Sequence, residues 1–409
     1  MRKSGIGTPR VRGTLVEHVW QHDPSTYAPA RYRRPCRYRA FIPNSLINLD
    51  LHLPGDIAGI VSEAEQAITD LNQRNVPEFT PLARLLLRTE SIASSKVEGM
   101  QVDARTLARA EVKQQVGHRV GPAATEILAN IDAMELAVER AVTSRHITTR
   151  DLADIHAALL NTAPNSRIAG HIRSAQNWIG GNDYNPCGAD FVPPPPDQVA
   201  RLLKDLCGFL DDEALPPLVQ AAIAHAQFET IHPFDDGNGR TGRALVQIVL
   251  RRRQLAPRFV PPVSVILARD KPHYIAGLEH FRADRVAAWI EIFAVATNRA
   301  ARLAARYGEH VRALQNTWRE RLRSQSNPRS DAASWAIIDI LPGHPVITVP
   351  VAVAATGRTK PAITNAVTEL ERVGVLRRLG ESLRNRAWEA DGLLDLIVGL
   401  EAGIEQPGR

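Results

Sequence analysis

The segment from His232 to Arg243, which reads HPFDDGNGRTGR, brings together residue types that suit phosphate chemistry. A histidine side chain titrates near neutral pH and can take a proton from an attacking hydroxyl. Asp236 offers carboxylate oxygens, the ligands that magnesium prefers. The next residues, Gly237–Gly239, allow backbone N–H groups to approach an anion closely. The segment therefore predicts a site that handles phosphate groups.

Two arginines extend this site. Arg240 and Arg243 are three residues apart, so they share one face of a helix that begins near Gly239. The N-terminus of that helix adds partial positive charge toward a bound phosphate. A plainer interpretation is a helix that ends at His232, a Gly-Asn-Gly turn and a basic exposed helix. The complete set of complementary groups favours the site.

The segment resembles the signature of the Fic family, His-Pro-Phe-x-(Asp or Glu)-Gly-Asn-Gly-Arg-x-x-Arg, and fills every specified position. The resemblance implies a protein adenylyltransferase (AMPylase) that transfers AMP from ATP to a Ser, Thr or Tyr hydroxyl of a protein. His232 would be the base that deprotonates this hydroxyl, Asp236 would hold magnesium, and Phe234 would anchor the loop in the core. The predicted ATP-binding residues are Asp236, Gly237, Asn238, Gly239, Arg240, Thr241, Gly242 and Arg243.

A second cluster, Ser94-Ser95-Lys96-Val97-Glu98-Gly99, lies at the end of a predicted helix. Its ordinary interpretation is a helix that stops at glycine beside a solvated glutamate. It also resembles the inhibitory motif of the family, (Ser or Thr)-x-x-x-Glu-(Gly or Asn). Ser94 and Glu98, four residues apart, are expected on one helical face. The resemblance implies that Glu98 pairs with Arg243 and holds the γ-phosphate away from its productive position.

The segment from Gly170 to Pro196 contains turn formers between apolar pairs and predicts a hairpin. It resembles the flap along which the family aligns a target peptide, here with Trp178, Ile179 and Gly180. Further along, Tyr274 is expected to contact the nucleotide. The family often has a Tyr-Tyr pair there, whereas this chain has His273-Tyr274.

Composition sets the broad class. The 409 residues allow two or three domains, and a hydrophobic content of 44% is ordinary for a globular protein. The net charge of +6 is compatible with nucleic-acid contact without requiring it. Three scattered cysteines suit a reducing cytosol better than a disulfide framework. Because the basic start lacks an apolar run and no long apolar stretch follows, we expect a cytoplasmic protein with no membrane contact.

Helical periodicity dominates the pattern between these motifs. Residues 1–54 show little periodicity and predict an irregular arm. From Pro54 onward the apolar spacing predicts an amphipathic helix, and further helices are expected over 81–97, 124–142, 149–160, 218–230 and 240–253. Thr149 is the predicted N-cap of the helix that it begins. A long helical stretch over 286–323 then leads to a linker over 324–330.

The pattern after residue 331 looks like a winged helix-turn-helix, with helices, a turn, a recognition helix and a two-stranded wing around Gly380-Glu381. Six basic side chains are candidates for phosphate contact: Arg358, Lys360, Arg377, Arg378, Arg384 and Arg386. Use of this module for dimerisation or domain packing is an equal alternative. DNA is therefore one expected partner, beside a protein substrate that includes the chain itself, and a homodimer stays open.

The predicted fold is mainly α, with a Fic-type helical core, a small β-hairpin flap and a C-terminal winged-helix domain. The expected parts are an N-terminal arm and helices with the inhibitory motif (1–115), the catalytic core (116–300), a helical linker (301–330), the winged helix-turn-helix (331–395) and a tail (396–409). The alternative function is a DNA-binding regulator whose Fic core has minor, absent or different activity, such as phosphocholine transfer. Gly239 argues against the kinase-like branch of the family, in which a lysine stands at this position.

Overall fold

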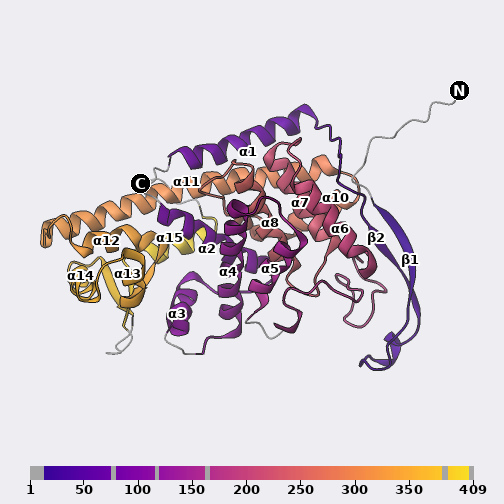
Figure 1. Cartoon of the computed structure of the whole chain (residues 1–409), viewed down its shortest axis with the longest axis horizontal. Helices are drawn as coiled ribbons and strands as arrows, with labels where there is room; N and C mark the ends of the chain where they lie inside the picture. The colour runs from indigo at the N-terminus through magenta and orange to yellow at the C-terminus, as the bar shows by residue number, and fades with distance from the viewer. Residues whose placement is uncertain (1–12, 75–79, 116–118, 162–165, 380–385, 405–409) are drawn as a thin grey trace. The chain divides into compact units, whose positions relative to one another are not determined.

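The computed structural model describes residues 13–74, 80–115, 119–161, 166–379 and 386–404. Most of these residues are helical, which confirms the mainly α prediction (Figure 1). The chain forms two compact units, each made of three separate segments. Unit 1 comprises Met1–Ser62, Leu136–Arg253 and Pro272–Val295, and unit 2 comprises Glu63–Glu135, Gln254–Lys271 and Ala296–Arg409.

Unit 1 begins with a regular antiparallel pair, β1 (Thr14–Trp20) and β2 (Cys36–Ile42), joined by a long loop that contains the 3-10 turn η1 (Ala30–Tyr32) (Figure 1). The prediction of an irregular arm over residues 1–54 is therefore wrong for 14–42, although residues 1–12 lie outside the described ranges. The loop is much longer than the turns of two to five residues from which a hairpin can be predicted in a sequence. In β2, Cys36, Tyr38 and Ala40 alternate with the exposed Arg37 and Arg39, a pattern typical of a strand, whereas β1 shows no such alternation.

The helices that lie wholly in unit 1 are α5 (Thr149–Leu160), α6 (Pro196–Leu210), α7 (Pro217–Ile231) and α8 (Asn238–Arg252), with the 3-10 turn η3 (Ser166–Ile168). Every residue of α7 after Pro217 is buried, as expected of a helix enclosed on all sides. Its alanines let α8 approach closely. The cap of α5 is Thr148 and not Thr149: the Thr148 hydroxyl accepts from Asp151 N, and the Asp151 carboxylate accepts from Thr148 N.

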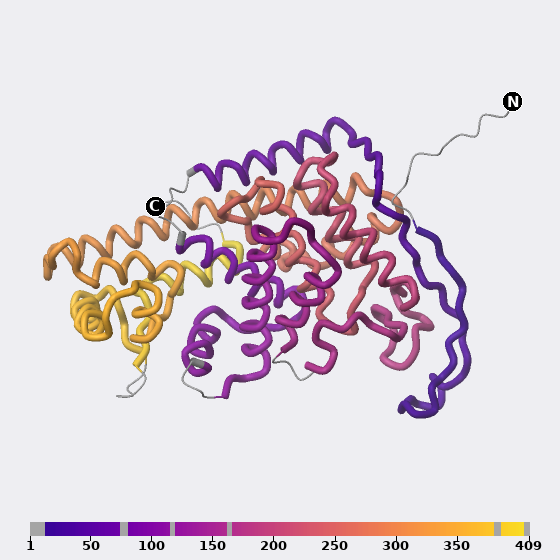
Figure 2. Tube along the Cα trace, in the orientation of Figure 1, coloured from indigo at the N-terminus to yellow at the C-terminus, as the bar shows by residue number. Residues whose placement is uncertain are grey.

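Four helices contribute residues to both units: α1 (Gly55–Arg74), α4 (Pro122–Thr143), α10 (Lys271–Arg282) and α11 (Val286–Gln325). Figure 2 traces α11 as one unbroken helix of 40 residues. Its bounds confirm the long helical stretch predicted over 286–323. The helix therefore extends almost to the end of the segment predicted as a linker.

Unit 2 contains α2 (Thr80–Val97), α3 (Ala104–Gln115) and α9 (Val263–Arg269). Its C-terminal part holds α12 (Ala333–Ile340), η4 (Leu341–Gly343), β3 (Val346–Thr348), α13 (Val349–Thr356), α14 (Lys360–Arg372), β4 (Leu376–Leu379), β5 (Ala387–Ala390) and α15 (Leu393–Glu401). The three strands form an antiparallel sheet in the order β3-β5-β4. The larger hydrophobic core of the unit includes the fully buried Trp318, Ile337 and Leu370, and a smaller one forms around Ile92, Leu107 and Ile127.

The elements from α12 to β5 follow the order predicted for a winged helix, with β3 added between the first two helices. Arg377 and Arg321 both donate to the Asp391 carboxylate, the latter over 2.8 Å, so Arg377 is engaged within the unit. Gly380, Glu381 and Arg384 lie outside the described residues. The winged-helix assignment and DNA binding by this part both stay predictions.

The cysteines depart from the expectation of reduced thiols, since Cys36 at the start of β2 forms a disulfide with Cys187. The two residues are 151 positions apart in sequence, and no spacing rule anticipates a pair that tertiary folding brings together. Cys207 stays a buried thiol, and burial raises its pKa to about 12. Within the described ranges, none of the helices is both apolar and long enough to cross a membrane.

Candidate active site

The predicted base lies where α7 ends. His232 leaves the helix in the left-handed conformation, with φ 49° and ψ 61°, which is uncommon for a residue other than glycine. Its N–H still bonds the Phe228 carbonyl over 2.9 Å. Arg173 Nε donates to the His232 carbonyl over 2.8 Å, and Asn177 Nδ2 donates to the same oxygen over 3.4 Å. These contacts hold the backbone in a turn that leaves the imidazole half-buried at the site.

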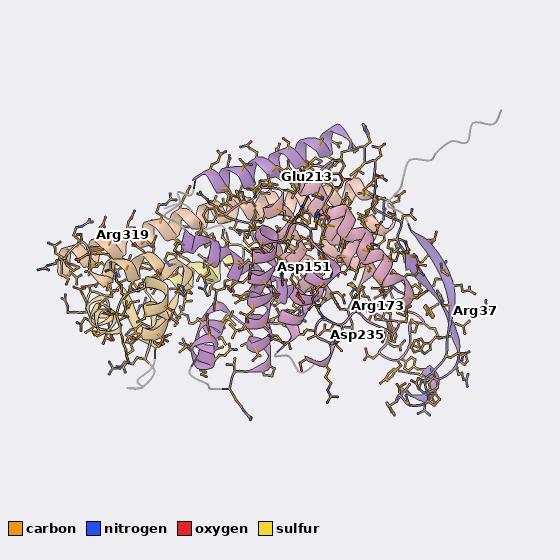
Figure 3. The ribbon with its side chains drawn as sticks, viewed as in Figure 1. Arg37, Asp151, Arg173, Glu213, Asp235 and Arg319 are labelled. Atoms are coloured by element: carbon orange, nitrogen blue, oxygen red, sulfur yellow. A yellow bond between two sulfur atoms is a disulfide. The ribbon has the colours of Figure 1, made fainter. Side chains whose placement is uncertain are left out.

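Arg173 secures this turn and was not singled out from the sequence. Its side chain is 3% exposed and also donates to the carbonyls of Ala175, Pro194 and Ile231. Burial lowers the Arg173 pKa to about 10, and the charge of Asp235 opposes that shift. Figure 3 shows both side chains in this region of unit 1. The cation lies at the negative end of the α7 dipole, where a positive charge is favourable.

Phe234 anchors the loop in the core, as predicted. The ring is fully buried and stacks on His156 of α5 with centroids 3.7 Å apart and planes 3° apart. His156 Nε2 donates to the Asp236 carbonyl over 2.9 Å, and His156 Nδ1 accepts from Gly170 N over 2.9 Å. One imidazole therefore fixes both the side chain and the backbone of the loop. Nothing in its local sequence distinguishes this histidine.

Asn238 closes the loop with its side chain. Its Oδ1 accepts from Phe234 N over 2.9 Å, and its Nδ2 donates to Phe234 O over 2.8 Å. Gly237 has φ 75° as the N-cap of α8, and a Cβ there would lie 3.0 Å from Leu159 and 3.3 Å from His156. Because both polar atoms of the Asn238 side chain bond Phe234, Asn238 could offer an anion only its backbone N–H. Helix α8 begins at Asn238, six residues after His232, and the anion hole at its N-terminus stays a prediction.

Asp236 and the arginines give the site its charges. The Asp236 side chain is 52% exposed, and its Oδ2 lies 3.7 Å from Arg240 Nη2. Arg240, Thr241 and Arg243 are each 2% exposed. Gly242 lies against α7, since a Cβ there would meet Glu229 Oε1 at 2.8 Å. Gly242 packs against α7, Gly239 is half-buried, and ATP binding by Gly239, Thr241 and Gly242 stays a prediction.

Asp236 fits a magnesium ion in one respect, because it presents exposed carboxylate oxygen at the loop that is predicted to bind phosphate. The described residues contain no cluster of three or more potential metal ligands. Magnesium commonly takes one or two carboxylates together with substrate phosphates. A single protein ligand at Asp236 is compatible with that pattern.

Tyr274 is 4% exposed, stacks on His225 and bonds His225 Nε2 through its hydroxyl over 2.9 Å. Its contact with the nucleotide stays a prediction. The flap differs from the predicted hairpin. In the flap the predicted hairpin is a single bridge between Ile179 and Phe191. Gly180 has φ 74°. Trp178 donates to Asn182 O over 2.6 Å and lies edge-on to Trp20 of β1.

The predicted inhibitory residues lie in unit 2. Helix α2 ends at Val97, so Glu98 falls in the turn after the helix and is exposed, whereas Ser94 is fully buried. The expectation that both side chains share one helical face is therefore wrong, because the helix stops before Glu98. Gly99 ends the turn with φ 87°, as a helix-terminating glycine does. The pairing of Glu98 with Arg243 stays a prediction.

Two regions of the sequence match known protein families, and parts of the chain are similar to known proteins. Residues 60–139 match the family described as Fic/DOC family N-terminal, and residues 146–250 match the Fic/DOC family. Protein adenylyltransferase fic-1 of Caenorhabditis elegans is 35% identical over 118 residues, or 28% of this chain and 21% of the relative. Protein adenylyltransferase Fic of Nematostella vectensis is 32% identical over 159 residues, or 38% of this chain and 34% of the relative. The matched regions thus span between a fifth and about a third of these relatives' lengths.

Among solved structures, a Fic family protein from Desulfovibrio desulfuricans G20 aligns with 84% of this chain and 98% of its own, at 22% identity and a TM-score of 0.49. The sequence matches cover the loop from His232 to Arg243, the helices on both sides of it and the helix that precedes Glu98. Residues 60–139 and 146–250 of the chain are therefore similar to the two regions of the Fic/DOC family.

Proposed function

We propose that the protein is an adenylyltransferase that moves AMP from ATP to a Ser, Thr or Tyr hydroxyl of a protein, the chain itself included. The observation that supports this most is the loop between α7 and α8. It places a half-buried histidine in a left-handed turn beside the N-terminus of a helix that carries two buried arginines. A base for a hydroxyl and a receptor for phosphate thus meet at one loop.

In the proposed reaction His232 takes the proton of the target hydroxyl. The hydroxyl oxygen forms a bond to the α-phosphorus of ATP, the bond from that phosphorus to the bridging oxygen breaks, and pyrophosphate leaves. The backbone of Gly237–Gly239 and the α8 N-terminus hold phosphate oxygens, and Arg240 and Arg243 compensate their charge. Magnesium, held by Asp236, would supply further neutralisation of the phosphates. Arg173 and His156 keep the loop in the conformation that brings these groups together.

The proposed activity is restrained by the turn that follows α2. Glu98 would pair with Arg243 and so compete with the γ-phosphate for that arginine. A charge-assisted pair with a partly desolvated arginine is strong enough to displace a phosphate oxygen. Supporting this, the chain carries both motifs, and Glu98 is exposed at the end of its helix rather than packed in the core of unit 2.

The test is incubation of the full chain with ATP and magnesium, read by intact mass and peptide mapping for an AMP adduct. We expect slow self-modification of the wild type. Glu98→Gly should react about tenfold faster, since couplings of this kind usually fall between roughly 5- and 150-fold. His232→Ala should lose about a hundredfold or more, the usual contribution of a general base.

His52→Ala, which removes an exposed histidine outside the site, is the matched control and should keep the wild-type rate. Absence of any AMP adduct in Glu98→Gly, on itself or on proteins of a cell lysate, would contradict the transferase proposal. An active Glu98→Gly that is no faster than wild type would contradict only the restraint.

A further inference from the structure

The end of α2, two residues before Glu98, is tied to the C-terminal helix α15 by an ion pair. Lys96 Nζ lies 3.0 Å from Glu401 Oε2, across 305 residues of sequence. The Glu401 side chain is only 2% exposed, and that of Lys96 is 29% exposed. Removal of one partner from such a pair leaves the other charge buried and uncompensated, which is far more costly than the loss of a surface pair.

Lys96 is the ion-pair partner of the Glu401 carboxylate, which has few other polar contacts in the part of the chain that the structure describes. Among the described residues its second oxygen, Oε1, is buried without a hydrogen-bond partner. Burial raises the Glu401 pKa, and the charge and hydrogen bond of Lys96 oppose that rise. The Lys96 ammonium therefore favours the ionised form of this carboxylate, against the effect of burial.

The turn that carries Glu98 is held from several directions within unit 2. Lys271 Nζ donates to the Val97 carbonyl over 2.6 Å, at the negative end of the α2 dipole. Within the turn, Gly99 N bonds Lys96 O over 2.9 Å and Met100 N bonds Ser95 O over 3.1 Å. Lys96 thus contributes its backbone to the turn and its side chain to α15.

Helix α15 is itself docked at both ends in unit 2. Arg269 Nη1 donates to Gly403 O over 2.6 Å, and the Tyr307 hydroxyl donates to Ile404 O over 2.9 Å. Leu393 and Leu400 are fully buried. The helix begins at Leu393, and only Asp391 and its N-cap Gly392 separate it from β5 of the C-terminal sheet. A displacement of that sheet or of the chain end would be transmitted to Glu401.

We propose that α15 is a latch on the restraint: the Lys96–Glu401 pair fixes the end of α2, and withdrawal of α15 frees the Glu98 turn and accelerates AMP transfer. This inference rests on the proposed function, in which Glu98 restrains the site. It gives the C-terminal part of the chain a regulatory role that requires no DNA contact.

The test compares full-length variants in two measurements, the rate of AMP self-modification and the amide hydrogen exchange of residues 94–100. Glu401→Gln removes the charge at nearly constant volume, and Lys96→Met removes the other partner. Gly399→Ala should displace α15 without changing either member of the ion pair, because the added Cβ would lie 2.6 Å from the Tyr307 hydroxyl. Asp395→Asn is the matched control, since it breaks the exposed pair between Arg105 and Asp395 on the same helix.

We expect exchange at residues 94–100 and the AMP rate to rise in the first three variants, the rate by about fivefold as for a coupling of about 1 kcal/mol. Asp395→Asn should change neither quantity. The double variant Glu98→Gly/Glu401→Gln should be no faster than Glu98→Gly, because both changes act on one restraint.

Unchanged exchange at residues 94–100 in both Glu401→Gln and Gly399→Ala would overturn the latch. So would a wild-type rate in these variants while Glu98→Gly is accelerated. If Glu98→Gly is not accelerated, the restraint in the proposed function fails instead, and the exchange measurement alone decides whether α15 holds the turn. A variant that loses its folded circular-dichroism spectrum is replaced in the comparison by either of the other two.

Discussion

His156 fixes the active-site loop through both nitrogens of one ring. Nε2 must carry a proton to donate to the Asp236 carbonyl, and Nδ1 must be unprotonated to accept from Gly170 N. A second proton, on Nδ1, would place two N–H donors, His156 Nδ1 and Gly170 N, in contact with no acceptor between them. Burial is the main reason why the His156 pKa is lowered to about 4. The neutral tautomer is therefore part of the folded structure.

This residue makes stability depend on pH in a defined window. The folded pKa of about 4 is below the ordinary value of 6.5, so the unfolded chain binds the proton first as the pH falls. The stabilisation is complete above pH 6.5 and is lost progressively toward pH 4, by about 3 kcal/mol at most. We expect the Tm of the wild type to fall more steeply between pH 7 and 4.5 than that of His156→Gln. Parallel curves would contradict this, and His344, whose pKa is also lowered to about 4, cancels in the comparison.

The loop residues also show which roles can be predicted from a local segment of sequence. The roles expected for Phe234 as an anchor and for His232 near a helix end follow from the segment itself, and the structure has them there. Arg173 and His156 could not be found in this way, because each acts on carbonyls of a segment distant in sequence. A buried arginine that bonds only carbonyls has no sequence pattern.

At the scale of elements, the site depends on how closely α7 and α8 approach. Gly242 makes this possible, since a Cβ there would lie 2.8 Å from Glu229 Oε1, 3.1 Å from Phe228 and 3.2 Å from His225. All three neighbours are buried side chains of α7. Little room exists for them to move, because packed interiors have few voids.

Gly242→Ala should therefore lower the Tm, although alanine is the better helix former by about 1 kcal/mol. Overpacking of this kind costs roughly 1–3 kcal/mol and outweighs that gain. Gly59→Ala in α1 is the matched control, since nothing lies within 4 Å of its Cβ, and it should raise the Tm slightly. A Tm in Gly242→Ala equal to or above the wild-type value would show that α7 and α8 can separate without cost.

Helices were predicted better than strands for a physical reason. The apolar spacing of α1, α2, α7, α8 and α11 is local and periodic, and their observed bounds agree with the predicted ranges within a few residues. The strands β1 and β2 are not joined by a short turn, and only β2 has an alternating apolar face; contacts with the flap stabilise both strands. Phe41 N bonds Val192 O over 2.9 Å, and Phe41 lies against Phe191.

At the scale of the whole molecule, the chain builds two compact units from interleaved segments. The boundaries predicted at residues 115, 300, 330 and 395 divide the sequence in linear order, and they stay a prediction. Interleaving arises from tertiary contacts between distant segments, which periodicity cannot reveal. The same limitation applies to the disulfide, whose partners belong to β2 and to the flap.

The disulfide gives a prediction for the entire chain. Under denaturing conditions without a reductant, an alkylating reagent should modify one of the three cysteines, Cys207, and all three after reduction. Cys36→Ser with Cys187→Ser should lower the free energy of unfolding, by about 5 kcal/mol at most on the chain-entropy estimate. Cys207→Ala is the control for loss of a buried thiol. Three adducts without reduction would contradict the pairing.

The bond between Cys36 and Cys187 also gives the chain a covalent ring. The ring includes the whole stretch of residues 60–139 that matches the family's N-terminal region, with the Glu98 turn inside it. His232 and the rest of the loop lie in the part of the chain that follows Cys187, outside the ring. A single break of the backbone inside the ring would leave both fragments of the chain joined, so the turn and the catalytic loop would remain parts of one molecule.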